Sequence, residues 1–181
     1  MSWIKDFNQN WTLFLDRDGV INERNFNGYI SEIDEFIFLP HVFDALERLQ
    51  KQFYRIIIVT NQQGVGKGLM TKDDLDKIHA YLLSQFEVKN IQIDGIYCAT
   101  NLKGDVDDRR KPNPKLALEA KADFPEIDFS KSIMVGDTES DIIFGKNLGM
   151  KTVLVKSKEK VTLQPDLLVS NLIEFANELG V

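Results

Sequence analysis

Short runs of apolar and β-branched residues alternate along this chain with longer segments in which apolar residues recur every three or four positions. This alternation is typical of an α/β fold with a mostly parallel sheet and helices on both faces. The predicted strands, the last of them weaker, are Thr12–Leu15, Ile56–Val59, Ile93–Tyr97, Ile133–Val135, Thr152–Val155 and Asp166–Val169. The predicted helices are Val42–Gln52, Lys72–Phe86, Pro114–Ala122, Ser140–Leu148 and Leu172–Leu179. The pattern therefore predicts a three-layer, Rossmann-like fold with five or six strands.

Length and charge narrow the class further. A chain of 181 residues with a 43% hydrophobic fraction is expected to form one domain, residues 1–181, with a proper core. The net charge of −6 argues against nucleic acid or an anionic membrane as a partner. We find no apolar run of signal-peptide or membrane-span length, and the single Cys98 suits a reducing compartment, so we expect a soluble, cytoplasmic protein. The oligomeric state stays open.

Polar residues follow three of the predicted strands where each strand ends. They are Asp16 and Asp18, Thr60 and Asn61, and Gly136 and Asp137. In an open parallel sheet the carboxyl ends of all strands lie at one edge, where such folds bind ligands. Residues far apart in the sequence are therefore expected to converge there.

The first motif is Asp16-Arg17-Asp18-Gly19. Side chains in extended backbone alternate, so we expect the Asp16 and Asp18 carboxylates on the same side, with Arg17 facing away. Two acids that share one small space repel each other unless a cation lies between them, and Mg²⁺ prefers such oxygen ligands. A surface turn would have the same sequence, but the buried strand that leads into Asp16 disfavours it.

Three further motifs each have a simpler explanation when taken alone. Thr60–Gln62 offers donors for phosphate oxygens, or a cap for the next helix. Arg109–Pro114 offers cations for a phosphate, or a solvated charge run. Asp137 would complete the shell of a metal, or cap a helix, while Asp141 would act through a water molecule or hold Lys111.

The four motifs, Asp-x-Asp-Gly, Thr-Asn, Lys-Pro and Gly-Asp-x-x-x-Asp, occur in this order between about residues 11 and 155. Together they resemble the haloacid dehalogenase (HAD) superfamily of phosphatases. The segments Leu15–Asn22, Gly28–Ile30, Phe38–Pro40 and Val59–Gln62 resemble the branch with heptose-1,7-bisphosphate 7-phosphatase and histidinol-phosphate phosphatase. The resemblance implies a HAD-like fold without a large cap domain, because residues 19–39 suffice only for a flap.

The resemblance also implies roles for the acids. Asp16 would be the nucleophile that forms an aspartyl-phosphate, and Asp18 would be the general acid and then the general base. Asp16, Asp137 and the backbone carbonyl of Asp18 would bind Mg²⁺, with Asp141 behind them.

The remaining roles concern the substrate. Thr60 and Lys111 would hold the transferring phosphoryl group, and Asn22, Asn61 and Arg110 would bind the substrate. That substrate would be a small phosphorylated metabolite, with a sugar phosphate such as heptose 1,7-bisphosphate first and histidinol phosphate as the close alternative. The sequence also leaves open a polynucleotide 3′-phosphatase and, from a different class, a phosphorylatable receiver domain.

This chain departs from the branch at several positions. The segment between Tyr97 and Arg110 has Cys98 but no His, so zinc is not expected there. Thr138 occupies the position at which the branch usually has Lys or Arg. The loss of that cation would weaken binding of a second phosphate. His41 and His79 are interpreted as surface or packing residues on helices.

Overall fold

The computed structural model describes residues 3–5 and 7–181, and its strands form a six-stranded sheet. The strands are β1 (Thr12–Leu15), β2 (Arg55–Asn61), β3 (Gly95–Ala99), β4 (Ser132–Gly136), β5 (Lys151–Val155) and β6 (Leu167–Val169). Their order is β3-β2-β1-β4-β5-β6, and all neighbouring pairs are parallel. The predicted parallel α/β fold is confirmed.

The direction in which the chain crosses the sheet reverses at β1. After β1 the chain adds β2 and β3 on one side, and it then returns to place β4, β5 and β6 on the other. Leu15 is in register with Ile58 of β2 and Val135 of β4, so Asp16 emerges beside the end of β4, while β2 continues to Asn61. Ligand crevices of open parallel sheets form at such a switch point, outside the carboxyl ends of the strands.

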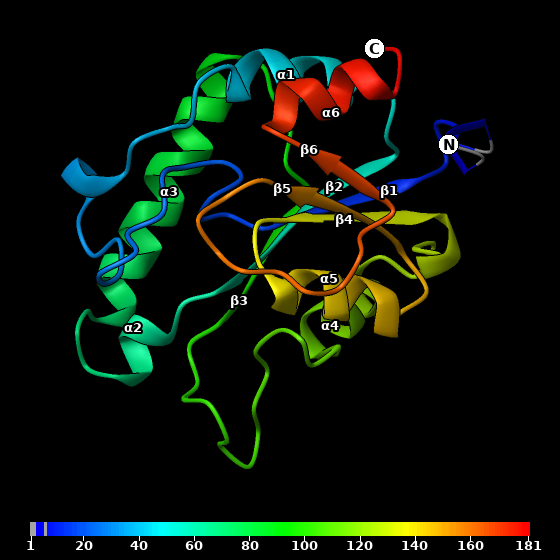
Figure 1. Ribbon diagram of the computed structural model, residues 1–181. Coiled ribbons are helices and arrows are strands. Elements are labelled where there is room, and N and C mark those ends of the chain that lie inside the picture. Colours follow the sequence, from blue (N-terminus) through cyan, green and yellow to red (C-terminus); the bar gives the residue numbers. More distant parts are fainter. Residues whose placement is uncertain (1–2, 6) are drawn as a thin grey trace.

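Helices cover both faces of the sheet (Figure 1). They are α1 (Val42–Leu49), α2 (Gln63–Gly66), α3 (Lys72–Val88), α4 (Lys115–Asp123), α5 (Glu139–Asn147) and α6 (Leu172–Glu178). Short 3-10 turns occur at Trp3–Lys5, Ile33–Glu35 and Phe129–Lys131. Leu13 and Leu15 pack in the core under α1, α3 and α6, whereas Phe14 packs in the core under α4 and α5. Both faces of β1 are therefore buried, which fixes the position of Asp16 at its end.

Two strand boundaries differ from the prediction. β2 extends through Thr60 and Asn61, which pair with Cys98 and Ala99, so these two residues end the strand rather than follow it. β3 was expected over Ile93–Tyr97 but runs over Gly95–Ala99. The Asp94 carboxylate accepts the hydrogen bond of the Ile56 amide, so this amide is bonded to a side chain and not to the backbone of β3.

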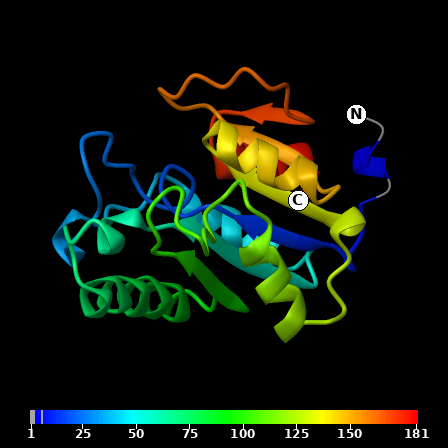
Figure 2. The same ribbon diagram turned by 90° about the horizontal axis from the view of Figure 1, so that it is seen from below.

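Two connections extend beyond the carboxyl edge of the sheet. The flap, residues 19–39, is anchored by bonds from the Glu23 amide to Ile37 and from the Leu39 amide to Ile21. The β3–α4 loop, residues 100–114, leads into α4. Figure 2 shows the flap in blue and the loop in green at the same end of the strands. Within the described part of the chain, no helix has the length and apolar character that crossing a membrane requires.

Candidate active site

A cavity of about 470 Å³ opens at the carboxyl edge of the sheet, where the flap, the β3–α4 loop and the start of α5 meet. The predicted site residues that line it are Asp16, Asp18, Asn61, Arg110 and Lys111. The other predicted site residues, Asn22, Thr60, Asp137 and Asp141, are buried and do not form its lining. The structure thus divides the predicted set into residues that face the cavity and residues that support its wall.

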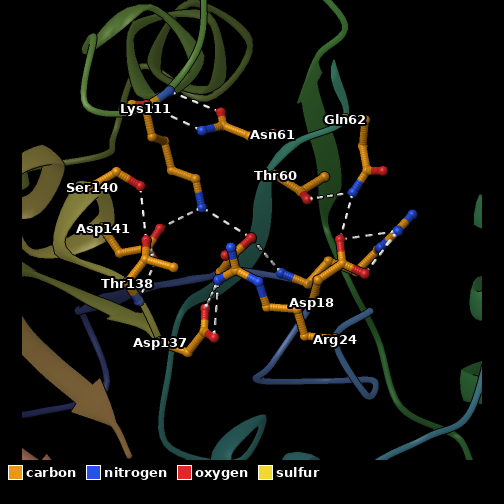
Figure 3. Close-up of polar contacts among 12 residues, drawn as sticks. Asp18, Arg24, Thr60, Asn61, Gln62, Lys111, Asp137, Thr138, Ser140 and Asp141 are labelled. Carbon is orange, nitrogen blue, oxygen red and sulfur yellow. Dashed lines mark hydrogen bonds and ion pairs between the residues drawn. The ribbon is translucent and has the colours of Figure 1, made fainter. Parts of the chain in front are cut away.

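Asp16 and Lys111 form the centre of the cavity floor. The Lys111 ammonium group lies 2.9 Å from Asp16 Oδ1 and 2.6 Å from Asp141 Oδ1, and its side chain is 1% exposed. Figure 3 shows the Lys111 side chain pointing toward Asp141. The contact between Asp141 and Lys111 is one of the two that the sequence left open for Asp141. Burial lowers the pKa of Lys111, but the two carboxylates raise it more, so Lys111 stays charged. It is therefore a fixed cation beside the Asp16 carboxylate.

Asp137 follows β4 and packs against the turn after β1. Gly19 has φ of 90°, and a Cβ there would lie 2.4 Å from Asp137 Oδ2, so glycine is required for this close approach. Both carboxylate oxygens of Asp137 accept hydrogen bonds of 3.2 Å from the Arg24 guanidinium, which the flap supplies. Asp137 thus lies behind the cavity wall, fully buried, with a carboxylate oxygen within 4.8 Å of an oxygen of Asp16.

Crowding of acids changes their protonation. Burial raises the pKa of Asp16 to about 7, and the neighbouring carboxylates add to this rise while Lys111 opposes it. Burial and the charge of Asp141 raise the pKa of Asp137 to about 6, against the influence of Arg24. Both shifts mean that the charged forms of these acids are disfavoured, first by burial and then by repulsion between the carboxylates. A bound divalent cation would relieve this repulsion.

The donor set fits Mg²⁺. Asp16, Asp137 and Asp141 each offer a carboxylate oxygen within 4.8 Å of the others, and Mg²⁺ prefers such hard oxygen ligands. Asp141 is already engaged, because Lys111 occupies its Oδ1 and Thr138, the N-cap of α5, donates to its Oδ2. Asp16 and Asp137 are therefore the better candidates to hold the metal, and Asp137 would then exchange its bonds from the Arg24 guanidinium for the cation.

Asp18 does not have the neighbours that strand alternation predicts. Its carboxylate accepts two bonds from Arg17 Nη2 (2.9 and 3.0 Å), one from Asn22 (2.9 Å) and one from Gln62 (2.7 Å). The expectation that Arg17 faces away from Asp18 is wrong, because the chain turns after Asp16 and the Ile21 amide bonds back to the Arg17 carbonyl. Burial raises the pKa of Asp18, but Arg17 and the amide donors lower it more. Asp18 is therefore held as a carboxylate.

The predicted asparagines hold other residues in place. Asn61 donates to the Lys111 carbonyl (3.1 Å) and accepts from its amide (2.9 Å), which fastens the β3–α4 loop to β2. Asn22 is fully buried and donates to Asp18, so the prediction that it binds substrate has no support in the cavity lining. Thr60 is 1% exposed, and its Oγ1 accepts a 2.9 Å bond from Gln62.

Arg110 lies at the mouth of the cavity, at the end of the β3–α4 loop. Its Nε is buried and has no hydrogen-bond partner among the described residues, and its amide donates to the Asp108 carboxylate (2.9 Å). The loop itself is held by ion pairs between Arg109 and Glu119 and between Lys115 and Asp107. Charged side chains thus fasten the loop in which the sequence lacks a set of zinc ligands.

The sequence interpretation missed Arg24, and it gave Gln62 as a donor for phosphate oxygens rather than as a partner of Asp18 and Thr60. The contact between Gln62 and Thr60 could have been found, because the two residues are two positions apart and so share one side of an extended segment. Arg24 could not, because its partner Asp137 is 113 positions away and the flap has no periodic pattern.

Comparison with known proteins agrees with this geometry. A HAD-hydrolase-like family profile matches residues 108–175. The D-glycero-alpha-D-manno-heptose-1,7-bisphosphate 7-phosphatase of Burkholderia mallei is 40% identical over 154 residues, which cover 81% of this chain and 80% of that protein. The chain belongs to this family of HAD-like phosphatases. The D-glycero-beta-D-manno-heptose-1,7-bisphosphate 7-phosphatase of Salmonella typhi is another relative, 36% identical, with 85% of each chain covered.

A solved structure extends the likeness of this HAD-like phosphatase to the fold. The D,D-heptose 1,7-bisphosphate phosphatase from B. bronchiseptica, complexed with magnesium and phosphate, superposes with a TM-score of 0.84. The two chains are 24% identical, and the match covers 93% of this chain and 97% of the other. The predicted HAD-like fold without a large cap domain agrees with that near-complete mutual coverage.

Proposed function

We propose that this chain hydrolyses the 7-phosphate of heptose 1,7-bisphosphate, with Mg²⁺ as its cofactor and an aspartyl-phosphate on Asp16 as the intermediate. The observation that carries the proposal is the Asp16 carboxylate, which lines the cavity and lies 2.9 Å from the buried ammonium of Lys111. A carboxylate fixed beside a cation is suited to attack a phosphoryl group whose charge that cation stabilises. The choice of a heptose bisphosphate as substrate is supported by the similarity to heptose-1,7-bisphosphate 7-phosphatases.

In the first step, an Asp16 oxygen attacks phosphorus, and the bond between phosphorus and the C7 oxygen breaks. The leaving oxygen takes a proton from Asp18, which therefore has to enter this step protonated although the free site favours its carboxylate form. In the second step, water attacks the aspartyl-phosphate, its proton goes to Asp18, and inorganic phosphate leaves with Asp16 restored. Lys111 neutralises the phosphoryl oxygens in both steps, with Asn61 holding its backbone.

Bound Mg²⁺, held by Asp16 and Asp137, would polarise the phosphoryl group and offset the repulsion between the acids and the phosphate. The acids and the raised pKa values of Asp16 and Asp137 support this assignment. The single Cys98, unpaired, supports action in the reducing cytoplasm.

The rest of the substrate would lie toward the mouth of the cavity. Arg24, Arg110 and Lys160 also line the cavity and provide cations for a second phosphate. Thr138 occupies the position at which the branch usually has a Lys or Arg, so that cation is missing. Arg24 of the flap supplies another cation, 3.2 Å from Asp137. We therefore favour a bisphosphate over a monophosphate such as histidinol phosphate.

The test is phosphate release by the purified protein from heptose 1,7-bisphosphate, in both anomers, and from histidinol phosphate, each with Mg²⁺ and with a chelator. We expect Mg²⁺-dependent turnover that is fastest on the bisphosphate, without any need for zinc. Faster turnover of histidinol phosphate would reassign the substrate. A phosphoryl label on the protein that persists for minutes in the native state, without phosphate release, would favour the receiver domain.

A further inference from the structure

A buried ion pair lies behind the cavity wall, between the turn after β1 and helix α3. The Arg17 side chain is 0% exposed, and its Nη2 donates to both carboxylate oxygens of Asp18, at 2.9 and 3.0 Å. Its Nη1 lies 3.3 Å from Nε2 of His79, and its guanidinium carbon lies 5.5 Å from the centre of the Phe36 ring. One arginine therefore joins a residue of the proposed reaction to a histidine that lies outside the cavity lining.

The chemistry of arginine fixes the direction of the contact with His79. A guanidinium has only donors, so Nη1 donates and His79 Nε2 accepts. An imidazole that accepts at Nε2 carries its proton on Nδ1 and is neutral. Burial, and next the positive charge of Arg17, lower the pKa of His79 to about 4, which agrees with a neutral ring at physiological pH.

Few other contacts hold the guanidinium. Its Nε is buried without a hydrogen-bond partner among the described residues, so its side chain is held by its polar contacts with Asp18 and His79. His79 in turn lies on a helix that is fixed by the core, where Leu75, Ile78 and Leu82 are at most 1% exposed. His79 is thus the rigid end of the chain of contacts, and Asp18 is the end that faces the cavity.

Arg17 Nη2 donates to both oxygens of Asp18, whereas the proposed role of Asp18 requires one of these oxygens to exchange a proton with the substrate. The bonds from Arg17 therefore have to hold the Asp18 carboxylate in one orientation and still allow one of its oxygens to take up a proton. The position of the Arg17 guanidinium determines whether both conditions are met, because the strength of a hydrogen bond depends steeply on distance and angle.

We propose that His79 is a positioning residue for the general acid–base Asp18 and acts through Arg17. The inference rests on the proposed function, and it assigns to His79 a role beyond packing. Without the acceptor at His79 Nε2, the buried Nη1 donor of Arg17 has no partner. The guanidinium then shifts, and the Asp18 carboxylate is no longer held in its orientation. The loss then falls on the proton transfer to the leaving group and spares attack by Asp16.

The test compares His79→Leu with His79→Gln, since a glutamine side chain places an acceptor oxygen near the position of Nε2. We measure kcat/KM for heptose 1,7-bisphosphate and for p-nitrophenyl phosphate, whose leaving phenolate needs no proton. The Leu variant is expected to lose about tenfold on the sugar phosphate, a fraction of what general acid catalysis contributes, and to change little on the aryl ester. The Gln variant is expected to retain most of the wild-type kcat/KM for the sugar phosphate. Asp18→Asn should lower kcat/KM for the sugar phosphate more than for the aryl ester, by a larger factor than His79→Leu does.

His41→Asn, at the exposed histidine of the chain, is the control and should leave both values unchanged. Equal losses on both esters, or a Gln variant as impaired as the Leu variant, would overturn the positioning role and leave the proposed function standing. A wild-type protein that hydrolyses no phosphate monoester would overturn both. Nitrogen-15 NMR of the folded protein adds a test that needs no turnover, because a protonated His79 ring at pH 7 would contradict the acceptor assignment.

Discussion

The floor and the rim of the cavity are built in opposite ways. What we call the floor consists of Asp16 and Lys111, which line the cavity, together with Asp137 and Asp141 directly behind them, and all four are at most 7% exposed. Three of these four follow a strand or begin a helix packed on the sheet, and their charges meet at 2.6 to 2.9 Å around Lys111. Their positions are set by the core. The floor is therefore suited to chemistry that requires fixed geometry.

The rim consists of Arg24, Arg110, Glu159 and Lys160, which come from the flap and from loops. The Arg24 and Glu159 side chains are 30% and 40% exposed and pair at 3.4 Å. Such exposed pairs contribute little to stability and are readily exchanged for a ligand. From this contrast we expect substitutions in the floor to change the rate of the chemical step and substitutions in the rim to change which substrate binds.

Asp16→Asn is the substitution with the largest expected effect. The amide has nearly the shape of the carboxylate but cannot attack phosphorus, so we expect kcat to fall by about 10⁴-fold or more. The fold should remain, because removal of a buried acid whose pKa is raised relieves repulsion. Phosphate release and thermal unfolding measure the two effects. Substantial turnover by this variant would place the nucleophile elsewhere.

Lys111→Met tests whether the floor depends on its buried cation. The substitution leaves Asp16 and Asp141 without that partner, so kcat should fall by about 10²- to 10³-fold. Unfolding free energy should fall by about 3–5 kcal/mol, the usual cost of breaking a buried pair. The control is Lys115→Met, because the Lys115 pair with Asp107 is exposed. An equal effect of the two substitutions would contradict the contrast between buried floor and exposed loop.

The sequence predicted most of the floor for a physical reason. A buried strand has to end at the sheet edge, so the places of Asp16 and Asp137 follow from the apolar runs before them. The environment of Asp18 did not follow, because alternation of side chains holds only in extended backbone. The chain leaves that conformation after Asp16, as the bond from the Ile21 amide to the Arg17 carbonyl shows.

The rim could not be predicted in the same way. The flap folds over the site through contacts between distant residues, such as Arg24 with Asp137, and neither partner shows this in its local sequence. The contact of His79 with Arg17 is similar, since it joins residues 62 positions apart. Motifs therefore located the chemical groups, and the fold was needed to show what holds and surrounds them.

Arg110→Ala is expected to separate binding from chemistry. Arg110 faces the cavity with a buried Nε that no described residue pairs, so its loss should raise KM for a bisphosphate by about tenfold, the value of a charge-assisted hydrogen bond, with little change in kcat. For a monophosphate, KM should change less. Arg109→Ala is the control for loop order, because Arg109 pairs with Glu119 and should affect both substrates alike. A fall in kcat with unchanged KM would assign Arg110 to the chemical step.

The smallest expected effect is a pH dependence of stability that belongs to the floor. Asp16 and Asp137, with pKa values of about 7 and about 6 against an ordinary value of 3.8, bind protons in the folded protein that they lose on unfolding. Their contribution is fully present below pH 3.8 and is lost as the pH rises to about 7, so the chelated protein should melt at lower temperature across this window. Asp16→Asn should flatten this slope. Asp107→Asn should not, because hydrogen bonding by Lys115 lowers the pKa of that exposed acid.

Because protons and Mg²⁺ compete for the same oxygens, the rise in melting temperature on adding Mg²⁺ should grow as the pH increases through 6 to 7. A slope that is the same in both variants, with a Mg²⁺ effect independent of pH, would show that the floor acids are not the groups that titrate.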